Sequence, residues 1–357
     1  QPTSANLLSG LSELAVENTQ IRILISSAQT GNPAVTQFLD NHAEGVADIA
    51  FRVRNLEALV ARVKQAGGQI QEAIHTRENE TGRVHWCRIA GWGSLSHTLI
   101  EYPHTQTRPP NIQLEPKAET ANVSESSAKL SPERSLDSLE QPDSQGLPWL
   151  SIDHAVLNVP LGQLEAAATW YEDQLGFARR QQFAIATAQS GLRSFVLKHP
   201  EGNATLPINE PTSRNSQIQE FLEFHQGAGI QHVALETRNL VQTVATLRQR
   251  GVPFLSVPST YYQQLSERPG FWHRAGDWDA IAQQQILVDW PADEPQTRLL
   301  QTFTQPVFER PTFFWELIER QAKSTRTGLK RVEGFGEGNF QALFEAIERE
   351  QQQRGSL

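Results

Sequence analysis

The chain has 357 residues, a hydrophobic fraction of 38% and a formal net charge of −9 at pH 7. At roughly 100–200 residues per domain this length allows two or three globular units, and no apolar run reaches the roughly 18 residues of a membrane-spanning helix. An acidic chain without basic runs is a poor candidate for binding nucleic acid or an anionic membrane. The single cysteine, Cys87, excludes a disulfide framework and a thiolate zinc cluster.

No targeting signal is recognisable in the first residues of this sequence. The first residue is Gln1 and the sequence contains no methionine, which indicates a processed or truncated form. No basic segment followed by an apolar one opens the chain, so a secretion signal is not expected and a reduced, cytoplasmic location is the default.

The first block with a periodic pattern predicts a small α+β unit. Alternating apolar residues predict strands at 21–26, 46–53, 84–89 and 98–102. Leucine and valine at helical spacing predict a helix from Leu56 to Val63, which Gly67 and Gly68 would end.

A change of composition then marks a linker. From Pro103 to Pro148 the chain is rich in Pro, Ser, Glu, Gln and Asn, and it has no aromatic residue until Trp149, which predicts a flexible connection. We therefore divide the chain into an N-terminal domain (1–103, expected to be truncated at its start), a linker (104–148) and a C-terminal domain (149–357).

The C-terminal block predicts a longer series of strands and helices. Strands are expected at 151–159, around Phe183, Phe195 and Leu206, at 230–235, near Phe254 and Ile286, and at 299–303 and 313–318. Helices are expected at 164–175 with a stop at Gly176, after a cap at Ser216, and at 241–247 with a stop at Gly251.

The last predicted element is an amphipathic helix. Phe340, Leu343, Phe344 and Ile347 follow the i, i+3, i+4, i+7 pattern, and a glycine-rich segment from Gly334 precedes them. A helix over 339–352 could form a lid on a hinge, or it could simply complete the core.

Internal repeats are the most informative feature. The segments 152–157 and 230–235 share the pattern Ile-x-His-x-x-Leu, and each begins a predicted strand that is followed by a helix and a glycine. A third copy at 48–56 aligns without gaps to 232–240, with Asp48 in place of His232 and Gly67 in place of Gly251. A fourth copy is expected before residue 21 but is not recognisable there, which again suggests truncation.

Two histidines at the same repeat position point to a metal site. Paired strands would bring His154 and His232 into one cavity, and Glu316 in the apolar strand 313–318 is the expected third ligand, because a buried carboxylate needs a partner. The alternatives are structural histidines and a solvent-facing or arginine-paired glutamate. Two histidines and one carboxylate form the facial triad of non-haem Fe(II) oxygenases, although hydrolytic zinc uses similar ligands. A second site made of Asp48 and Glu101 is the weaker idea.

Further motifs surround these residues. They are Ile152-Asp-His154, Ser190-Gly-Leu-Arg-Ser194, Pro207-Ile-Asn-Glu-Pro211, Ser216-Gln-Ile-Gln-Glu-Phe-Leu222, 227–235, Tyr261-Tyr262, 299–304, Arg310-Pro-Thr312 and 334–340. With them, residues 151–355 closely resemble 4-hydroxyphenylpyruvate dioxygenase, of the vicinal-oxygen-chelate fold, and residues 21–103 resemble the metal-free N-terminal half of that family. The implied fold class is α+β, with tandem βαβββ vicinal-oxygen-chelate modules forming two half-barrel domains and a C-terminal lid helix.

The resemblance also implies a site and a reaction. One Fe(II) would be held by His154, His232 and Glu316, with O2 as co-substrate and a small aromatic 2-oxo acid as the partner. The implied polar catalytic residues are Ser194, Asn209, Gln217, Gln231 and Gln301, and the implied substrate-binding residues are Phe303, Phe314, Phe335, Asn339 and Phe340. Oxidative decarboxylation, ring hydroxylation and side-chain migration would give homogentisate and CO2, for tyrosine breakdown or for tocopherol and plastoquinone synthesis. A homodimer and a homotetramer both stay open.

Rival functions follow from the same resemblance. 4-Hydroxymandelate synthase shares the triad and the substrate but departs from the motifs at 207–211 and 334–340. A non-catalytic member of the fold that binds aromatic ligands would not need the triad, and a zinc or nickel lyase such as glyoxalase usually has two carboxylate ligands. The chain itself departs from the family pattern in a proline-rich loop at 289–298 and at Trp315 and Glu319.

Overall fold

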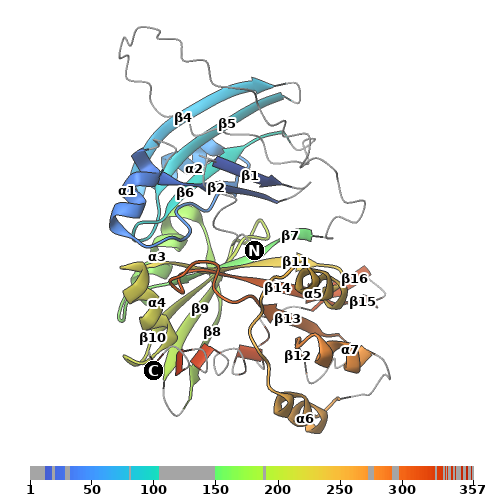
Figure 1. Cartoon of the computed structure of the whole chain (residues 1–357). Helices are drawn as coiled ribbons and strands as arrows, with labels where there is room; N and C mark the ends of the chain where they lie inside the picture. Colours follow the sequence, from blue (N-terminus) through green and yellow to red (C-terminus); the bar gives the residue numbers. More distant parts are fainter. Residues whose placement is uncertain are drawn as a thin grey trace, which may run out of the picture.

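The computed structural model describes residues 13–17, 21–28, 33–79, 82–103, 149–187, 190–271, 277–291, 297–325, 328–332 and parts of the segment 334–355. These residues form an α+β structure with two main sheets, one above the other in Figure 1. The predicted linker at 104–148 lies outside the described residues. None of the described helices is long and apolar enough to cross a membrane.

The N-terminal half contains a hairpin, a four-stranded sheet and two helices. Its elements are β1 (Glu13–Glu17), β2 (Arg22–Ser26), α1 (Pro33–Asn41), β3 (Phe51–Arg52), α2 (Leu56–Gln65), β4 (Ile70–Asn79), β5 (Gly82–Ala90) and β6 (Ser96–Glu101), with sheet order β3-β6-β5-β4. The predicted helix at 56–63 and the strands at 84–89 and 98–102 are confirmed. The strand expected at 46–53 reduces to isolated bridges at Val46 and Asp48 followed by the short β3.

Local side chains and a glycine fix both ends of helix α2. The Asn55 side chain accepts a hydrogen bond from the Ala58 amide, and Glu101 Oε2 accepts one from the Leu56 amide at 2.6 Å, so two free amides of the first turn are satisfied. Gly67 ends the helix with a φ of +80°. Glu101, considered above as a second-site ligand, therefore caps a helix.

The C-terminal half is built on one eight-stranded sheet. Its order is β12-β13-β14-β11-β7-β10-β9-β8. The strands are β7 (Trp149–Asn158), β8 (Ala178–Ala186), β9 (Gly191–Lys198), β10 (Thr205–Pro211), β11 (Gly229–Thr237), β12 (Leu287–Asp289), β13 (Leu299–Phe303) and β14 (Phe314–Arg320). The helices are α3 (Leu164–Leu175), α4 (Gln217–His225), α5 (Leu240–Gln249), α6 (Ser259–Glu267) and α7 (Asp277–Gln283), and β15 (Ala322–Thr325) and β16 (Gly328–Arg331) form a separate hairpin.

The sheet contains the same strand arrangement twice, once in each repeat. β7 pairs with β10 in parallel, β11 pairs with β14 in parallel, and β7 and β11 pair antiparallel at the centre. The two repeat strands are therefore neighbours, as the internal repeat predicted. The half-barrel of two βαβββ units that the resemblance implied is present in this half.

Several elements differ from the sequence expectation. Helices α6 and α7 lie between residue 254 and β12, and the strand expected near Phe254 is a single bridge to Thr304. The described residues of the predicted lid, which are 339–340, 342, 347–348 and 351–352, are helical. Leu343 and Phe344 lie outside the described residues, so a continuous lid helix stays a prediction.

The two halves share a buried contact. His97 on β6 is fully buried, and its Nε2 lies 3.0 Å from the hydroxyl of Tyr171 on α3. Arg62 on α2 also donates to the carbonyl oxygens of Glu172 and Asp173 at the end of α3. Helix ends accept such cations well, so the N-terminal sheet is held against the C-terminal one.

This contact predicts an acid-sensitive fold. Burial lowers the pKa of His97 from 6.5 to about 4. Between these pH values, His97 is therefore protonated in the unfolded chain and neutral in the folded chain. The free energy of unfolding should therefore decrease as the pH falls from 6.5 toward 4, by at most about 1.4 kcal/mol per pH unit. Urea unfolding at several pH values measures this slope. His97→Gln should reduce it, and equal slopes in the two proteins would contradict the assignment.

Candidate metal centre

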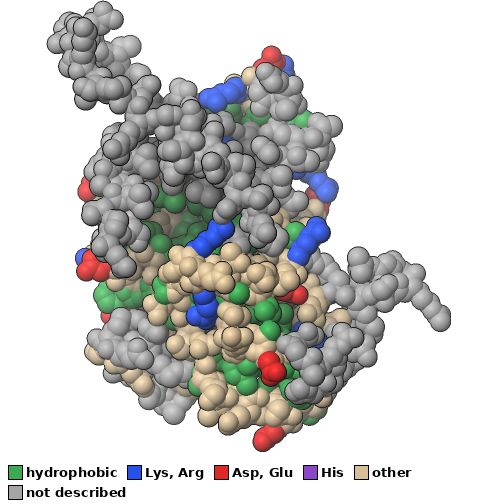
Figure 2. Space-filling model, turned by 45° about the vertical axis from the view of Figure 1, so that its right-hand side comes forward, with side chains coloured by type: hydrophobic (Ala, Val, Ile, Leu, Met, Phe, Trp, Pro, Cys, Tyr) green, Lys and Arg blue, Asp and Glu red, His purple; other side chains and the backbone are tan. Residues whose placement is uncertain are grey.

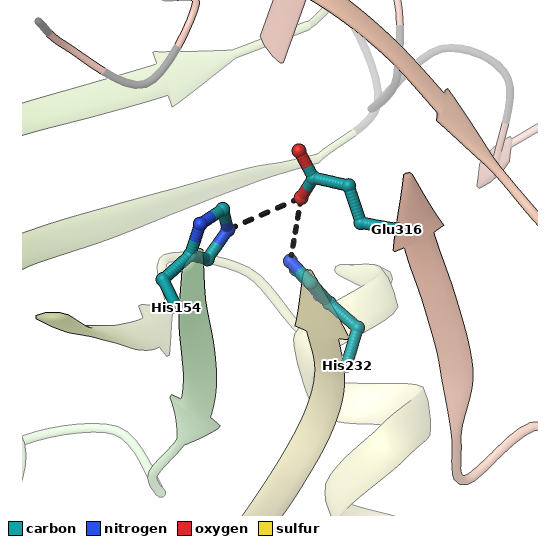
Figure 3. A group of neighbouring side chains, drawn as sticks. All are labelled: His154, His232 and Glu316. Carbon is teal, nitrogen blue, oxygen red and sulfur yellow. Dashed lines mark ion pairs between the residues drawn. The ribbon is translucent and has the colours of Figure 1, made fainter. Parts of the chain in front are cut away.

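Three neighbouring strands bring the predicted ligands to one face of the sheet. His154 lies on β7, His232 on β11 and Glu316 on β14 (Figure 3). Ala234 on the middle strand pairs with both His154 and Glu316, and residues directly opposite each other project to the same face. The small, fully buried Ala234 side chain leaves room for the two longer side chains to meet over it. His232 lies two residues earlier on the same face.

The three side chains converge on one point. Glu316 Oε2 lies 3.1 Å from His154 Nε2 and 3.4 Å from His232 Nε2, and the side chains are 2%, 3% and 8% exposed, respectively. Their potential ligand atoms all lie within 4.8 Å of one another, and this is the one such group of three among the residues that the structure describes. This buried arrangement, with two imidazoles facing one carboxylate oxygen, fits the ligand set of a single metal ion.

The charges in this group depend on one another. Burial alone would raise the pKa of Glu316, but the two facing imidazoles outweigh it and hold the pKa at about 2. Burial lowers the pKa of His232, whereas the carboxylates of Glu316 and Asp153 overcome burial at His154 and raise its pKa to about 9. Without a metal, the carboxylate is therefore ionised and His154 holds a proton at neutral pH. A metal must displace that proton to bind.

A chain of hydrogen bonds holds the carboxylate ligand from behind. Gln301 Nε2 donates to Glu316 Oε1 at 2.9 Å, and Asn339 Nδ2 donates to Gln301 Oε1 at 2.7 Å. The hydroxyl of Tyr261 then donates to Asn339 Oδ1 at 3.0 Å. Gly336, with a φ of +71°, passes so close to Gln301 that an added Cβ would overlap its side-chain oxygen. Gln301 and Asn339 thus hold the Glu316 ligand in place. The sequence motifs alone did not reveal this supporting role.

A pocket opens beside the two histidines. Of the predicted site residues, it is lined by Asn209, Gln217, Gln231 and Phe340, together with the two histidines. Its apolar lining includes Ile347 of the expected lid stripe, and the other lining residues were not predicted as pocket residues: Val156, Phe183, Ile185, Leu192, Pro207 and Ile218. These side chains come from four strands, α4 and the C-terminal segment, so no single sequence motif marks them. Mixed apolar walls with a few amides suit a small aromatic ligand.

Three further predicted residues, Phe303, Phe314 and Ser194, lie next to a ligand or to a strand that lines the pocket. Phe314 stacks on the His232 ring at a centroid distance of 4.8 Å, and Phe303 meets that ring edge-on at 6.4 Å. Ser194 is fully buried, and its Oγ has no hydrogen-bond partner among the described residues; the same holds for Gln217 Oε1. Phe335 lies outside the part of the chain that is described.

In the N-terminal half the corresponding place holds an ion pair. β3 runs parallel to β6 as β11 does to β14, and this register places Asp48 where His232 lies and Thr98 where Glu316 lies. Arg88 Nε donates to Asp48 Oδ2 at 3.2 Å, and Thr98 Oγ1 donates to the same oxygen at 3.0 Å. A guanidinium thus neutralises the buried carboxylate.

On the face shown in Figure 2, acidic and basic side chains of the described residues are scattered between apolar ones, without a continuous basic patch.

Comparison with known proteins agrees with this geometry. Residues 151–268 match the model of the Glyoxalase/Bleomycin resistance protein/Dioxygenase superfamily. A solved mutant of 4-hydroxymandelate synthase from Streptomyces coelicolor superposes with a TM-score of 0.73 at 24% identity over 95% of this chain and 87% of that one, a likeness of fold.

Sequence relatives are closer. An uncharacterised protein of Synechocystis sp. is 33% identical over 92% of this chain and 84% of its own length. The 4-hydroxyphenylpyruvate dioxygenase of Caenorhabditis briggsae is 36% identical over 96% of this chain and 82% of its own length. With this identity along nearly the whole chain and a buried His-His-Glu triad, the protein belongs to the 4-hydroxyphenylpyruvate dioxygenase family.

Proposed function

We propose that the protein is an Fe(II)-dependent 4-hydroxyphenylpyruvate dioxygenase that converts 4-hydroxyphenylpyruvate and O2 into homogentisate and CO2. The observation that carries this proposal is the ligand set, two buried imidazoles and one buried carboxylate on one face of the sheet. The Nε2 atoms of His154 and His232 lie 3.1 and 3.4 Å from Glu316 Oε2, respectively. Non-haem Fe(II) oxygenases use such a set. The dioxygenase relatives in nematodes and in Yarrowia lipolytica support the choice of substrate.

The reaction balances without another co-substrate. The 2-oxo acid loses its carboxyl carbon as CO2, and this oxidative decarboxylation together with the oxidation of the ring on hydroxylation supplies the electrons for the full reduction of O2. One oxygen atom enters the new carboxyl group and the other enters the ring. When bound, Fe(II) would supply the coordination positions at which the 2-oxo acid and O2 are activated.

The protein's own contribution is binding, orientation and exclusion of water. The amides of Gln217, Gln231 and Asn209 are the pocket groups that can hydrogen-bond the polar ends of the substrate. Phe183 and Phe340 stack at 5.0 Å and provide an apolar wall for the aromatic ring. Phe314 holds the plane of the His232 ring from behind. Fixed geometry of this kind lowers the barrier by removing the cost of orienting the reactants.

An oxygen-uptake assay tests the proposal. Protein reconstituted with Fe(II) is mixed with 4-hydroxyphenylpyruvate, and oxygen consumption and products are followed together. Equal amounts of homogentisate, CO2 and consumed O2 are expected. Formation of 4-hydroxymandelate would instead identify the synthase activity, and an iron-loaded protein that consumes no oxygen with this substrate would refute the proposal.

Metal stoichiometry gives a related prediction. In the N-terminal counterpart of the site, Arg88 neutralises Asp48 and Thr98 hydrogen-bonds to it, so one Fe(II) should bind per chain, in the C-terminal half. Metal analysis after anaerobic reconstitution measures the ratio. Two equivalents, or none, would contradict this assignment.

A further inference from the structure

The two histidine ligands are supported in different ways. The ladder between β7 and β11 is irregular just before each of them: Asp153 is the extra residue between Ile152 and His154, and Gln231 is the extra residue before His232. Bulges of this kind turn a side chain out of the normal alternation. Gln231 consequently lines the pocket, whereas Asp153 Oδ1 accepts a hydrogen bond from His154 Nδ1 at 2.8 Å.

Only one of the two ligands therefore has a carboxylate behind it. His232 Nδ1 has no hydrogen-bond partner among the described residues, and its ring is held by stacking on Phe314. At His154, the carboxylate of Asp153 keeps the hydrogen on Nδ1, so Nε2 is the nitrogen that can ligate. Partners of this type fix the tautomer and the ring plane of a metal-binding histidine.

Asp153 is itself held by Arg320, the last residue of β14. Arg320 Nε donates to Asp153 Oδ2 at 2.6 Å and Nη2 donates to Oδ1 at 2.8 Å, a bidentate pair between side chains that are 12% and 11% exposed. A planar guanidinium fixes a carboxylate in direction as well as in position, which an ammonium group cannot do.

The same arginine also binds the backbone that leads to the C-terminal segment. Its Nη1 donates to the Gly334 carbonyl at 2.6 Å and lies 3.4 Å from the Val332 carbonyl. A few residues later, Asn339 bonds to Gln301, which holds the carboxylate ligand. The start of the C-terminal segment is therefore tied to the supports of two metal ligands.

We propose that Arg320 is a positioning residue of the metal centre: through Asp153 it fixes the ring of His154, and through the carbonyls at 332 and 334 it couples metal binding to the docking of the C-terminal segment. The proposal rests on the metal site and not on the identity of the substrate. A protein that binds metal but makes no homogentisate would refute the proposed function and leave this inference standing.

The test compares Arg320→Gln, Arg320→Lys and Asp153→Asn with the parent protein. Co(II) is titrated as a spectroscopic probe, and hydrogen exchange is measured over residues 328–342 with and without Co(II). Both arginine variants should bind Co(II) about 10- to 100-fold more weakly, with an altered visible spectrum and faster exchange in that segment. Asp153→Asn should weaken binding similarly but leave the exchange near the parent level, because the contact between Arg320 and Gly334 remains.

Arg88→Gln is the matched control, since it also breaks a buried arginine–aspartate pair, with Arg88 11% exposed, but touches no ligand. It should lower the stability of the protein and leave the Co(II) affinity and spectrum of the His154–His232–Glu316 site unchanged. The inference fails if the Arg320 variants keep the parent affinity and spectrum, or if Arg88→Gln weakens Co(II) binding equally. If Arg320→Gln does not fold, Arg320→Lys and Asp153→Asn decide the question by the same criteria.

Discussion

Glu316→Ala is expected to abolish turnover and metal capture while the protein still folds. The substitution removes the single anionic ligand of the group and leaves two imidazoles as the remaining ligands. The loss of metal affinity should exceed the roughly 10- to 100-fold effect of losing an outer partner of a ligand. Metal retention after gel filtration, circular dichroism and oxygen uptake at saturating Fe(II) measure the three properties.

Glu319→Gln provides the control on the same strand. Glu319 Oε2 accepts a hydrogen bond from the Leu240 amide at the start of α5, away from the triad. Gln removes the charge but keeps an oxygen that can accept this hydrogen bond, so the change should cost at most about 1 kcal/mol of stability, with metal content unaltered. Sustained oxygen uptake by Glu316→Ala would show that Glu316 is not a ligand.

Removing the chain from residue 334 onward is expected to uncouple oxygen consumption from homogentisate formation. The deletion takes away Phe340 and Ile347 from the pocket wall and Asn339 from Gln301. Exposure of the pocket to water and a small displacement of reacting groups can each lower productive turnover, by about 100-fold for a misplacement of about 1 Å. Comparing O2 consumed with homogentisate formed, on protein that is still folded, tests the role of this segment as a lid.

A point variant addresses the same role without deleting residues. Glu348 is buried and accepts a hydrogen bond from Thr187 Oγ1 at 2.7 Å and another from Ser190, which fastens the C-terminal segment to the β8–β9 connection. Glu348→Ala should show a milder form of the same uncoupling. A truncated protein that makes homogentisate at the parent rate would refute the lid, and an insoluble one beside a normal Glu348→Ala would favour a helix that only completes the core.

The sequence predicted the ligands because repetition and periodicity carry their positions. His154 and His232 occupy equivalent positions in two copies of one sequence repeat. The strands that carry the two copies, β7 and β11, pair with each other, so equivalent residues lie close together. Glu316 was recognisable as a carboxylate within an apolar strand. Helix α6 was missed because, among its residues 259–267, only Leu265 is buried, so its apolar periodicity is weak.

The support around the ligands could not be predicted in the same way. Asp153 is adjacent to His154, and simple strand alternation would place it on the opposite face; only the bulge turns it toward the imidazole. Arg320 lies 167 residues away from Asp153 in the chain. Such a long-range pair depends on the three-dimensional register of the strands, which a single sequence does not state.

The ion pair between Asp48 and Arg88 has a consequence for how the protein responds to its surroundings. A ligand that binds only the folded state stabilises it by RT ln(1 + [M]/Kd), so the C-terminal half should gain stability when iron is plentiful and lose it when iron is scarce. The N-terminal half carries its cation on its own side chain and needs none from outside. The stability of the N-terminal sheet should therefore depend less on the supply of iron than the stability of the C-terminal sheet does.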